Sequence, residues 1–288
     1  MGARVITGVV GIALFVGVCL WGVTPFGIGA TVLAATALWE LHRAFRAKGL
    51  RPSIPLSVLG LAAPIWLSLP PMAGYRRMAG AGSLGDPTPI DVRPDLLVAA
   101  VVAVLILALC WEVIGAARSG ELCVGQNVGA GLLCGAYVAL FGGLVWLRTH
   151  RGGVGDCGFV LLAAACVWAD DSFAFFVGRA WGRRKLAPAL SPAKSVEGFV
   201  GGLVAAAIVG AVGGKLLTDF PLIGLYVGLI AGVLGPAGDL FESALKRELG
   251  VKDLGAIMPG HGGVLDRFDS LLFVAPAVAI LLSVCRFA

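Results

Sequence analysis

Charged residues are scarce in this chain. Asp, Glu, Lys and Arg make up 14% of its 288 residues, whereas a soluble globular domain typically carries about 25%. Hydrophobic residues make up 58%, and the mean hydropathy is +0.94. A water-soluble chain of this composition would lack the polar side chains that cover a surface, so an ordinary soluble domain is excluded. The sequence therefore predicts a protein whose solvent is lipid.

Histidine and paired cysteine are also scarce. The histidines His42, His150 and His261 are too dispersed to suggest a zinc site. The seven cysteines are scattered, mostly inside apolar runs, and none forms a C-x-x-C pair. This pattern favours buried small hydrophobic side chains over a metal site or a disulfide framework.

Long apolar runs, in contrast, are abundant. About 20 apolar residues cross the hydrocarbon core as a helix, so we expect an all-α, polytopic membrane protein with about nine spans. Its parts would be 1–157, with spans one to five, and 158–288, with spans six to nine and their loops. The longest interruption, Met72 to Asp95, is rich in Gly and Pro and predicts an irregular loop. The expected spans are 5–23, 26–45, 55–71, 96–117, 127–147, 158–179, 198–217, 221–247 and 269–286, of which the third is short and contains proline.

The orientation follows from the basic residues of the loops. With the N-terminus inside, most of the 22 Lys and Arg residues fall in cytoplasmic segments. The segments Gly178–Glu197 and Gly238–Asp269, which are unusually polar, then both face the cytosol. We therefore expect the N-terminus in the cytoplasm and a site on the cytoplasmic face.

Ionisable side chains inside spans are costly and commonly face a site or a partner. Glu40 and Glu112 lie near cytoplasmic helix ends, where capping or pairing with a nearby Arg is the simplest role. Asp170 and Asp171 lie deeper and point about 100° apart on a helix, so one can face a site and the other a partner.

The richest stretch follows Gly235-Pro236. Asp239, Glu242, Ser243 and Lys246 are spaced i, i+3, i+4 and i+7, which places them on one helix face. Such a stripe is also typical of the solvated end of an apolar helix.

A glycine-rich loop comes next. Glycines flank His261, and exposed backbone N–H groups of such loops suit phosphate oxygens. Asp266 and Asp269 follow at once. Carboxylates from separate segments beside a glycine loop and several Lys and Arg predict Mg²⁺-dependent chemistry on a phosphorylated substrate.

This segment resembles the signature of the phosphatidate cytidylyltransferases, or CDP-diacylglycerol synthases. The matching residues are Ser243, Lys246, Arg247, Lys252, Asp253, His261, Gly262, Gly263, Asp266, Arg267 and Asp269. Asp171-Ser172 to Gly178-Arg179 and Ser191-Pro192 to Glu197-Gly198 look like a second block of the same family. The resemblance covers roughly 160–286, and the first half matches only in hydropathy and in Glu40. Phe175 stands where the family usually has Tyr, Ser195 replaces Thr, and Val196 replaces an aromatic residue.

The resemblance implies roles for individual residues. Asp239 and Asp266 are the expected ligands of Mg²⁺, with K⁺ as a second cation, and both acids are expected to be catalytic. Auxiliary ligands would be Asp171, Glu242 and Asp269. Lys246, Lys252, Arg267 and His261 complete the expected catalytic set, in which His261 orients the loop or contacts a phosphate. The expected substrate-binding residues are Arg179, Ser191, Lys194, Ser195, Glu197, Ser243, Arg247, Gly262 and Gly263.

The resemblance implies the reaction of CTP with phosphatidate to give CDP-diacylglycerol and diphosphate. We expect a multi-pass protein of the cell inner membrane that contacts membrane lipid, forms a homodimer and binds no nucleic acid. Three other classes remain open. A transporter or channel would need acids at the bilayer midplane. Another CTP-using lipid enzyme, such as a polyprenol or phytol kinase or an archaeal ether-lipid cytidylyltransferase, would differ in acceptor. A non-catalytic lipid-binding scaffold would not need so many acids and bases.

Overall fold

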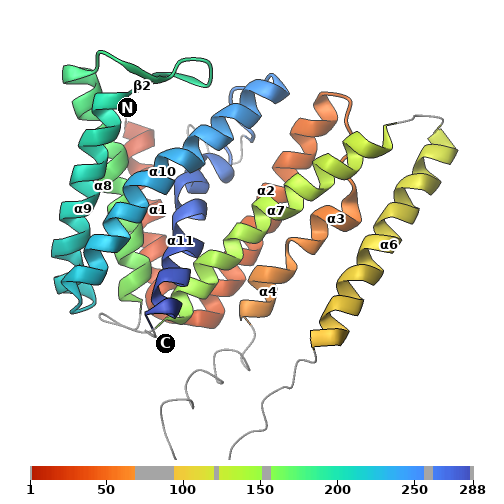
Figure 1. Cartoon of the computed structure of the whole chain (residues 1–288), viewed down its shortest axis with the longest axis horizontal. Coiled ribbons are helices and arrows are strands. Elements are labelled where there is room, and N and C mark those ends of the chain that lie inside the picture. The colour runs from red at the N-terminus through yellow and green to blue at the C-terminus, as the bar shows by residue number, and fades with distance from the viewer. Residues whose placement is uncertain (1, 69–93, 120–122, 151–156, 256–261, 286–288) are drawn as a thin grey trace, which may run out of the picture.

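The part of the protein that the structure describes is a bundle of long helices with a small hairpin (Figure 1). The computed structural model describes residues 2–68, 94–119, 123–150, 157–255 and 262–285. The hairpin is formed by the antiparallel strands β1 (Lys185–Ala187) and β2 (Ser191–Ser195). The helices are α1 (Gly2–Trp21), α2 (Val23–Ala47), α3 (Ile54–Leu59), α4 (Ala62–Ser68), α6 (Pro94–Ser119), α7 (Val124–Thr149), α8 (Gly158–Trp181), α9 (Val196–Leu217), α10 (Pro221–Leu249) and α11 (Leu265–Val284).

The expected all-α, membrane-spanning class is confirmed. Six described helices, α2, α7, α8, α9, α10 and α11, are long and apolar enough to cross a bilayer. Among the described residues, the apolar stretches of α1 and of the α3–α4 pair are shorter than these six helices. The predicted third span is broken, because α3 and α4 are separate helices on either side of Gly60 and Leu61. A side chain at Gly60 would collide with the backbone of Gly135 in α7, so the break fits closely against that helix.

The two polar segments expected to share a face lie at the same end of the bundle. The hairpin, the C-terminal end of α10 and the start of α11 are all at the top of Figure 1, where α2 and α6 also end. Helix α1 begins at this end and α11 finishes at the opposite one, so the helical chain starts and ends on opposite sides (Figure 1). We call the end with the hairpin the site end.

Small residues bring α9 and α10 together. A methyl group at Gly214 of α9 would lie 2.7 Å from the Cα of Gly224 of α10, and one at Gly210 would lie 2.9 Å from the Cα of Gly228. Lipid offers helices little hydrophobic reason to associate, so close backbone packing at small residues holds such pairs. The outer side of α9 is correspondingly apolar and exposed, with Leu216 73% exposed.

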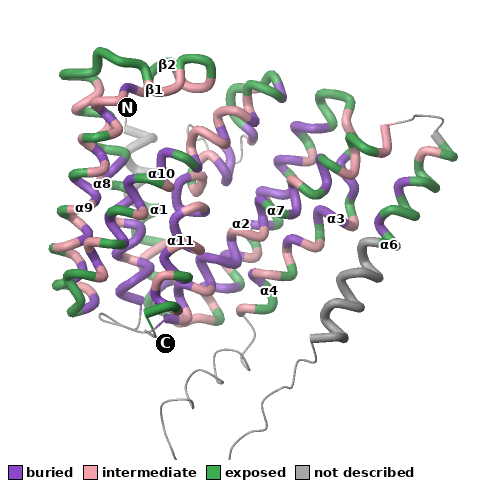
Figure 2. The backbone as a smooth tube through the Cα atoms, in the orientation of Figure 1, coloured by how far each residue is buried: buried purple, intermediate pink, exposed green. Residues whose placement is uncertain are grey.

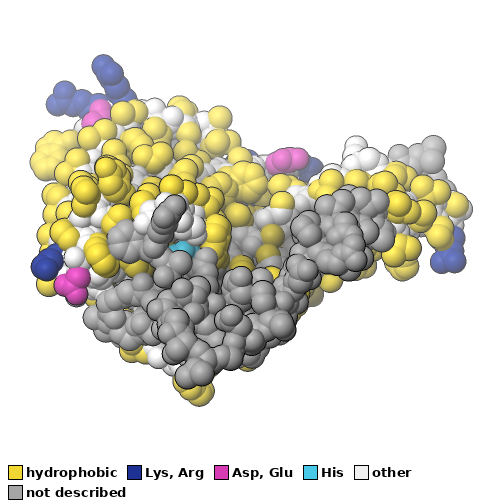
Figure 3. Space-filling view, turned by 60° about the horizontal axis from the view of Figure 1, so that its bottom comes forward, with side chains coloured by type: hydrophobic (Ala, Val, Ile, Leu, Met, Phe, Trp, Pro, Cys, Tyr) yellow, Lys and Arg dark blue, Asp and Glu magenta, His cyan; other side chains and the backbone are white. Residues whose placement is uncertain are grey.

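The described residues separate into a buried interior and an apolar exterior. Figure 2 shows buried positions on the sides of α7, α8, α10 and α11 that face one another. Hydrophobic side chains cover much of the described surface that faces the viewer in Figure 3. Helix α6 lies at the edge of the bundle, where it packs against α3 and α7 (Figure 1). This distribution is the one expected for a bundle surrounded by lipid.

Candidate active site

Helix α10 carries one polar face at its site end, as its spacing predicted. Ser243 Oγ donates to Asp239 Oδ1 at 3.3 Å, and Lys246 Nζ lies 3.2 Å from Glu242 Oε1. Glu242 is buried, with 1% of its side chain exposed, so the face points into protein and is not simply a solvated helix end. The helix ends at Gly250, whose φ of 72° is in the left-handed region that favours glycine.

The start of α11 adds two more carboxylates. Asp266 accepts a hydrogen bond from the backbone N–H of Gly263 at 2.6 Å, which ties the glycine loop to the first turn of the helix. Lys246 Nζ forms a second ion pair with Asp266, so one ammonium group joins α10 to α11. The helices approach closely here, because a Cβ at Gly238 would lie 2.5 Å from the backbone oxygen of Asp269. Glycine at position 238 therefore lets Asp239 and Asp269 line the same cavity.

The hairpin reaches over the site from the other side. Lys194 Nζ of β2 lies 2.5 Å from Asp239 Oδ2. The carboxylate of Glu197 accepts from the backbone N–H groups of Arg183 at 3.0 Å and Arg184 at 3.2 Å, which ties the hairpin to the first turn of α9. Ser195 caps that turn by accepting from Gly198 N–H at 3.1 Å. These contacts hold Lys194 over the α10 carboxylates.

A cavity of about 450 Å³ lies between α8, the hairpin, α10 and α11, and we call it the acidic cavity. Its carboxylates come from three helices, and its cations from α8 and the hairpin. Asp170 is buried, with 1% of its surface exposed, whereas Asp171 is open to the cavity. The charged residues that line it are Asp170, Asp171, Arg179, Lys194, Asp239, Asp266 and Asp269. An excess of carboxylates favours cations, or a phosphate ligand that arrives with cations.

Most residues predicted for the site gather at or beside the acidic cavity. Ser195 also lines it, while Glu242, Ser243 and Lys246 stand directly behind Asp239 and Asp266. Ser191 and Glu197 belong to the hairpin and its anchor, and Arg247 Nε donates to the Leu190 carbonyl of the hairpin at 3.5 Å. Gly262 and Gly263 precede α11, next to the Asp266 carboxylate.

Two other predicted residues within the described ranges also stay outside the acidic cavity. Lys252 and Arg267 are exposed and do not line it. His261 lies outside the described residues.

The structure also places two carboxylates that the sequence had not assigned to the site. Asp170 forms part of the cavity wall. Glu40 of α2 is fully buried, and its Oε2 accepts from the backbone N–H of Val264 at 2.8 Å. A methyl group at Gly263 would lie 2.6 Å from the same oxygen, so the glycine loop closes directly onto Glu40. In the sequence, Asp170 and Glu40 could be recognised because each is a charged residue inside an apolar span. Only the fold shows which segment each of them contacts.

The donor set fits a divalent cation that binds together with phosphates. Among the described residues, no three His, Cys, Asp or Glu side chains already form a complete metal-ligand group. Mg²⁺ does not require one, since it usually takes one or two carboxylates and completes its shell with water and substrate phosphate oxygens. Asp239 and Asp266 present such oxygens, and each is paired with a lysine, Lys194 and Lys246.

Comparisons with known proteins cover nearly the whole chain. The sequence profile described as "Cytidylyltransferase family" matches residues 2–285. A Staphylococcus haemolyticus protein named phosphatidate cytidylyltransferase is 34% identical over 285 residues, which is 98% of this chain and 99% of that protein. A Bacillus subtilis protein of the same name is 34% identical over 289 residues, 98% of each chain. The similarity therefore extends well beyond 160–286, into a first half whose motifs alone did not reveal it.

Proposed function

The chain belongs to the cytidylyltransferase family, and we propose that it transfers the cytidylyl group of CTP to phosphatidate. The products are CDP-diacylglycerol and diphosphate. The relatives that are similar over their full length carry the name of this activity. The observation that carries the proposal is the acidic cavity at the end of a lipid-facing bundle, in which Lys194 meets Asp239. Asp266 also lines this cavity and is paired with Lys246 behind it.

For this reaction, neutralising the negative charge of the phosphates is more important than transferring a proton. A phosphate oxygen of phosphatidate attacks the α-phosphorus of CTP, the bond from that phosphorus to the bridging oxygen breaks, and diphosphate leaves. The nucleophile is already an anion, so no strong base is required. The barrier is the repulsion between two phosphorylated reactants and the need to align them.

In this proposal, carboxylates of the chain bind the metal ions, and its Lys and Arg side chains bind phosphate or orient the carboxylates. We assign Asp239 and Asp266 as the ligands of Mg²⁺, with K⁺ as a companion cation. A bound Mg²⁺ would neutralise phosphate charge and align the reacting groups. Lys194 and Arg179 line the cavity from the hairpin and α8, where they can bind phosphate oxygens. Lys246 is in contact with Glu242 and Asp266, so it fixes the direction of the Asp266 carboxylate.

The position of the cavity suits one water-soluble and one membrane-bound substrate. We propose that the site end faces the cytoplasm of the cell inner membrane. The support is the clustering of basic residues there, as in the α10 end and the hairpin, under the rule that such residues stay inside. CTP would then enter from the cytosol, while phosphatidate keeps its acyl chains in the bilayer.

The arrangement disfavours a transporter. Its acids gather at one end of the helices beside a hairpin and a glycine loop, whereas transporter sites lie near the bilayer midplane. Another CTP-using lipid enzyme would share the nucleotide site and differ in the lipid acceptor.

The test is an assay of purified protein with CTP labelled in the α-phosphate, Mg²⁺ and one lipid acceptor at a time. We expect label in a CDP-lipid with phosphatidate, together with release of diphosphate. An archaeal-type ether lipid serves as an alternative acceptor in the same assay. Polyprenol and phytol are tested with CTP labelled in the γ-phosphate, because a lipid kinase transfers that group and leaves the α-phosphate in CDP. Product from one of these and none from phosphatidate would overturn the assignment of the substrate. No nucleotidyl transfer to any acceptor would overturn the proposed reaction.

A further inference from the structure

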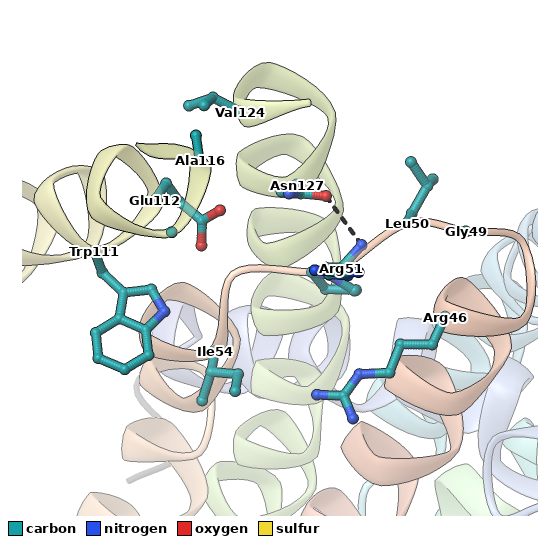
Figure 4. Close-up of a pocket in the computed structure, with 12 residues that line it drawn as sticks. Arg46, Gly49, Leu50, Arg51, Ile54, Trp111, Glu112, Ala116, Val124 and Asn127 are labelled. Atoms are coloured by element: carbon teal, nitrogen blue, oxygen red, sulfur yellow. Dashed lines mark hydrogen bonds between the residues drawn. The ribbon is translucent and has the colours of Figure 1, made fainter. Parts of the chain in front are cut away.

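A second cavity lies at the site end, away from the acidic cavity. It has a volume of about 620 Å³ and shares no lining residue with the acidic cavity. Its walls come from the end of α2, the connection to α3, the α6 helix and the start of α7 (Figure 4). We call it the α2–α6 cavity, and the proposed reaction assigns it no role.

Its charges are separated between two walls. Arg46, in the last turn of α2, and Arg51, in the following connection, bring positive charge to one side. Glu112 brings a carboxylate from α6 on the other side, and Figure 4 shows Arg46 and Glu112 reaching in from different helices. Glu112 is only 8% exposed, so its charge is directed into the protein and not into bulk water. A dipolar ligand fits this arrangement better than a simple anion, which Glu112 would repel.

Neutral groups complete the lining. The backbone N–H of Arg51 donates to Asn127 Oδ1 at 2.9 Å, which fixes the α2–α3 connection against α7. Trp111 and Ile54 supply apolar surface and are 59% and 46% exposed. Tryptophan is enriched where bilayer hydrocarbon meets the head groups. On α6, one to two turns before Trp111, Ile106 and Leu107 are exposed as well, so an apolar helix surface continues from the cavity toward the bilayer centre.

We propose that the α2–α6 cavity binds a membrane glycerophospholipid whose phosphodiester head group ends in a primary ammonium, as in phosphatidylethanolamine. The phosphate lies between Arg46 and Arg51. The ammonium donates to the carboxylate of Glu112, and the acyl chains run along the exposed apolar surface of α6. The lipid thereby joins α6, at the edge of the bundle, to α2.

The test measures lipid binding to delipidated, purified protein by native mass spectrometry. Phosphatidylethanolamine, phosphatidylcholine and phosphatidylglycerol with the same acyl chains are titrated separately. The choline head group cannot donate a hydrogen bond from its nitrogen, and the glycerol head group carries no positive charge. We expect phosphatidylethanolamine to bind about twofold to fivefold more tightly than either, the range that one partly exposed ion pair provides. Equal affinity for all three lipids would overturn the proposal.

Substitutions in the α2–α6 cavity test whether the lipid binds there. Glu112→Gln should remove the preference for phosphatidylethanolamine, and Arg46→Gln should weaken binding of all three lipids. Arg43→Gln is the matched control, because Arg43 lies one turn earlier on α2, stacks on Trp39 at 5.7 Å and does not line the cavity. Unchanged binding in Glu112→Gln, or an equal loss in Arg43→Gln, would contradict the assignment. Ala116→Phe fills the cavity without changing a charge and should also reduce binding, so the test does not depend on one variant folding.

Competition by soluble glycerophosphoethanolamine tests whether the cavity binds the head group alone or requires the whole lipid. We expect it not to compete at concentrations at which the lipid binds, because it lacks the acyl chains that pack on α6. Competition at equal concentration would show that the cavity recognises a soluble phosphodiester and would overturn the lipid assignment.

Discussion

The Glu40 carboxylate in α2 accepts a hydrogen bond from the backbone N–H of Val264, 224 positions further along the chain, at 2.8 Å. Val264 lies between the glycine loop and α11, the helix that carries Asp266 and Asp269. A fully buried side chain from the N-terminal half thus holds the segment that positions the carboxylates of the C-terminal half. The first half is therefore part of the site's support and not only a membrane anchor.

Replacing Glu40 should damage turnover although the residue does not line the acidic cavity. A hydrogen bond to a charged group contributes about 1.5–3 kcal/mol, so we expect Glu40→Ala to lower kcat by about tenfold or more. Glu40→Gln keeps one acceptor oxygen and should retain more activity. Steady-state assays that separate kcat from KM for CTP, together with thermal unfolding, provide the measurement. Glu248→Gln, at an exposed position of α10, is the control. Full kcat in Glu40→Ala would show that the loop does not need this contact.

Asp239 and Asp266 should both be essential. Asn retains the size of each side chain but removes the charge that would bind Mg²⁺, and metal stabilisation of phosphate charge is worth several kcal/mol. We expect Asp239→Asn and Asp266→Asn each to lower turnover by about a hundredfold or more, with the protein still folded. Removing divalent cations with a chelator should abolish the activity of the wild type, and adding Mg²⁺ should restore it. Asp219→Asn changes an exposed acid at the other end of the bundle and should have no effect. Near-normal turnover in either site variant would disprove its role as a ligand.

Lys246 should matter for stability as well as activity. Its ammonium group pairs with two carboxylates whose side chains are 1% and 5% exposed, so Lys246→Met would leave buried acids without their cation. Breaking a buried ion pair typically costs about 3–5 kcal/mol. Thermal unfolding in detergent should show a clear drop in Tm for Lys246→Met. Lys215→Met is the matched control, since the Lys215–Asp219 pair is 67% and 81% exposed and should contribute at most about 1 kcal/mol. Similar Tm values for the two variants would contradict the ion-pair geometry.

Gly238 should tolerate no side chain. A Cβ there would lie 2.5 Å from the Asp269 carbonyl oxygen and would push α10 away from α11. We expect Gly238→Ala to reduce both Tm and turnover, with overpacking costing about 1–3 kcal/mol. Gly129→Ala provides the contrast, because nothing lies within 4 Å of a Cβ at that position of α7. Alanine in an open helix position should leave stability unchanged or raise it by up to about 1 kcal/mol. A harmless Gly238→Ala would mean that the two helices are not in close contact at this point.

The local features of the site could be predicted from residue spacing. Asp239, Glu242, Ser243 and Lys246 share one helix face because a helix repeats every 3.6 residues, and the structure confirms this with two contacts among them. The break in the third span was harder to predict from the sequence. The third predicted span is short and contains proline, but the close fit of Gly60 against Gly135 depends on a helix that lies far along the chain.

The long-range relationships could not be predicted in this way. Glu40 was expected to cap a helix end or pair with an arginine, and it instead binds the backbone that precedes α11. Asp170 and Asp171 were expected to differ in surroundings, and both line the acidic cavity, one buried and one open. The dimer, K⁺ and the role of His261 stay predictions, and His261 lies outside the described residues.

The sequence by itself determined that the chain is a helical membrane protein, and it predicted which residues share the polar face of α10. The composition and the length of an apolar run decide whether a segment is stable in lipid, and the spacing of residues on a helix face is set by the local backbone. Neither property depends on contacts between residues that are distant in the sequence. Only the tertiary structure decided which helices are neighbours. Because lipid is as apolar as the helix faces, hydrophobicity does not select the partner of a helix. Close packing at Gly238 and the buried hydrogen bond of Glu40 do so, and they help to bring the carboxylates and basic side chains of the candidate site to one cavity.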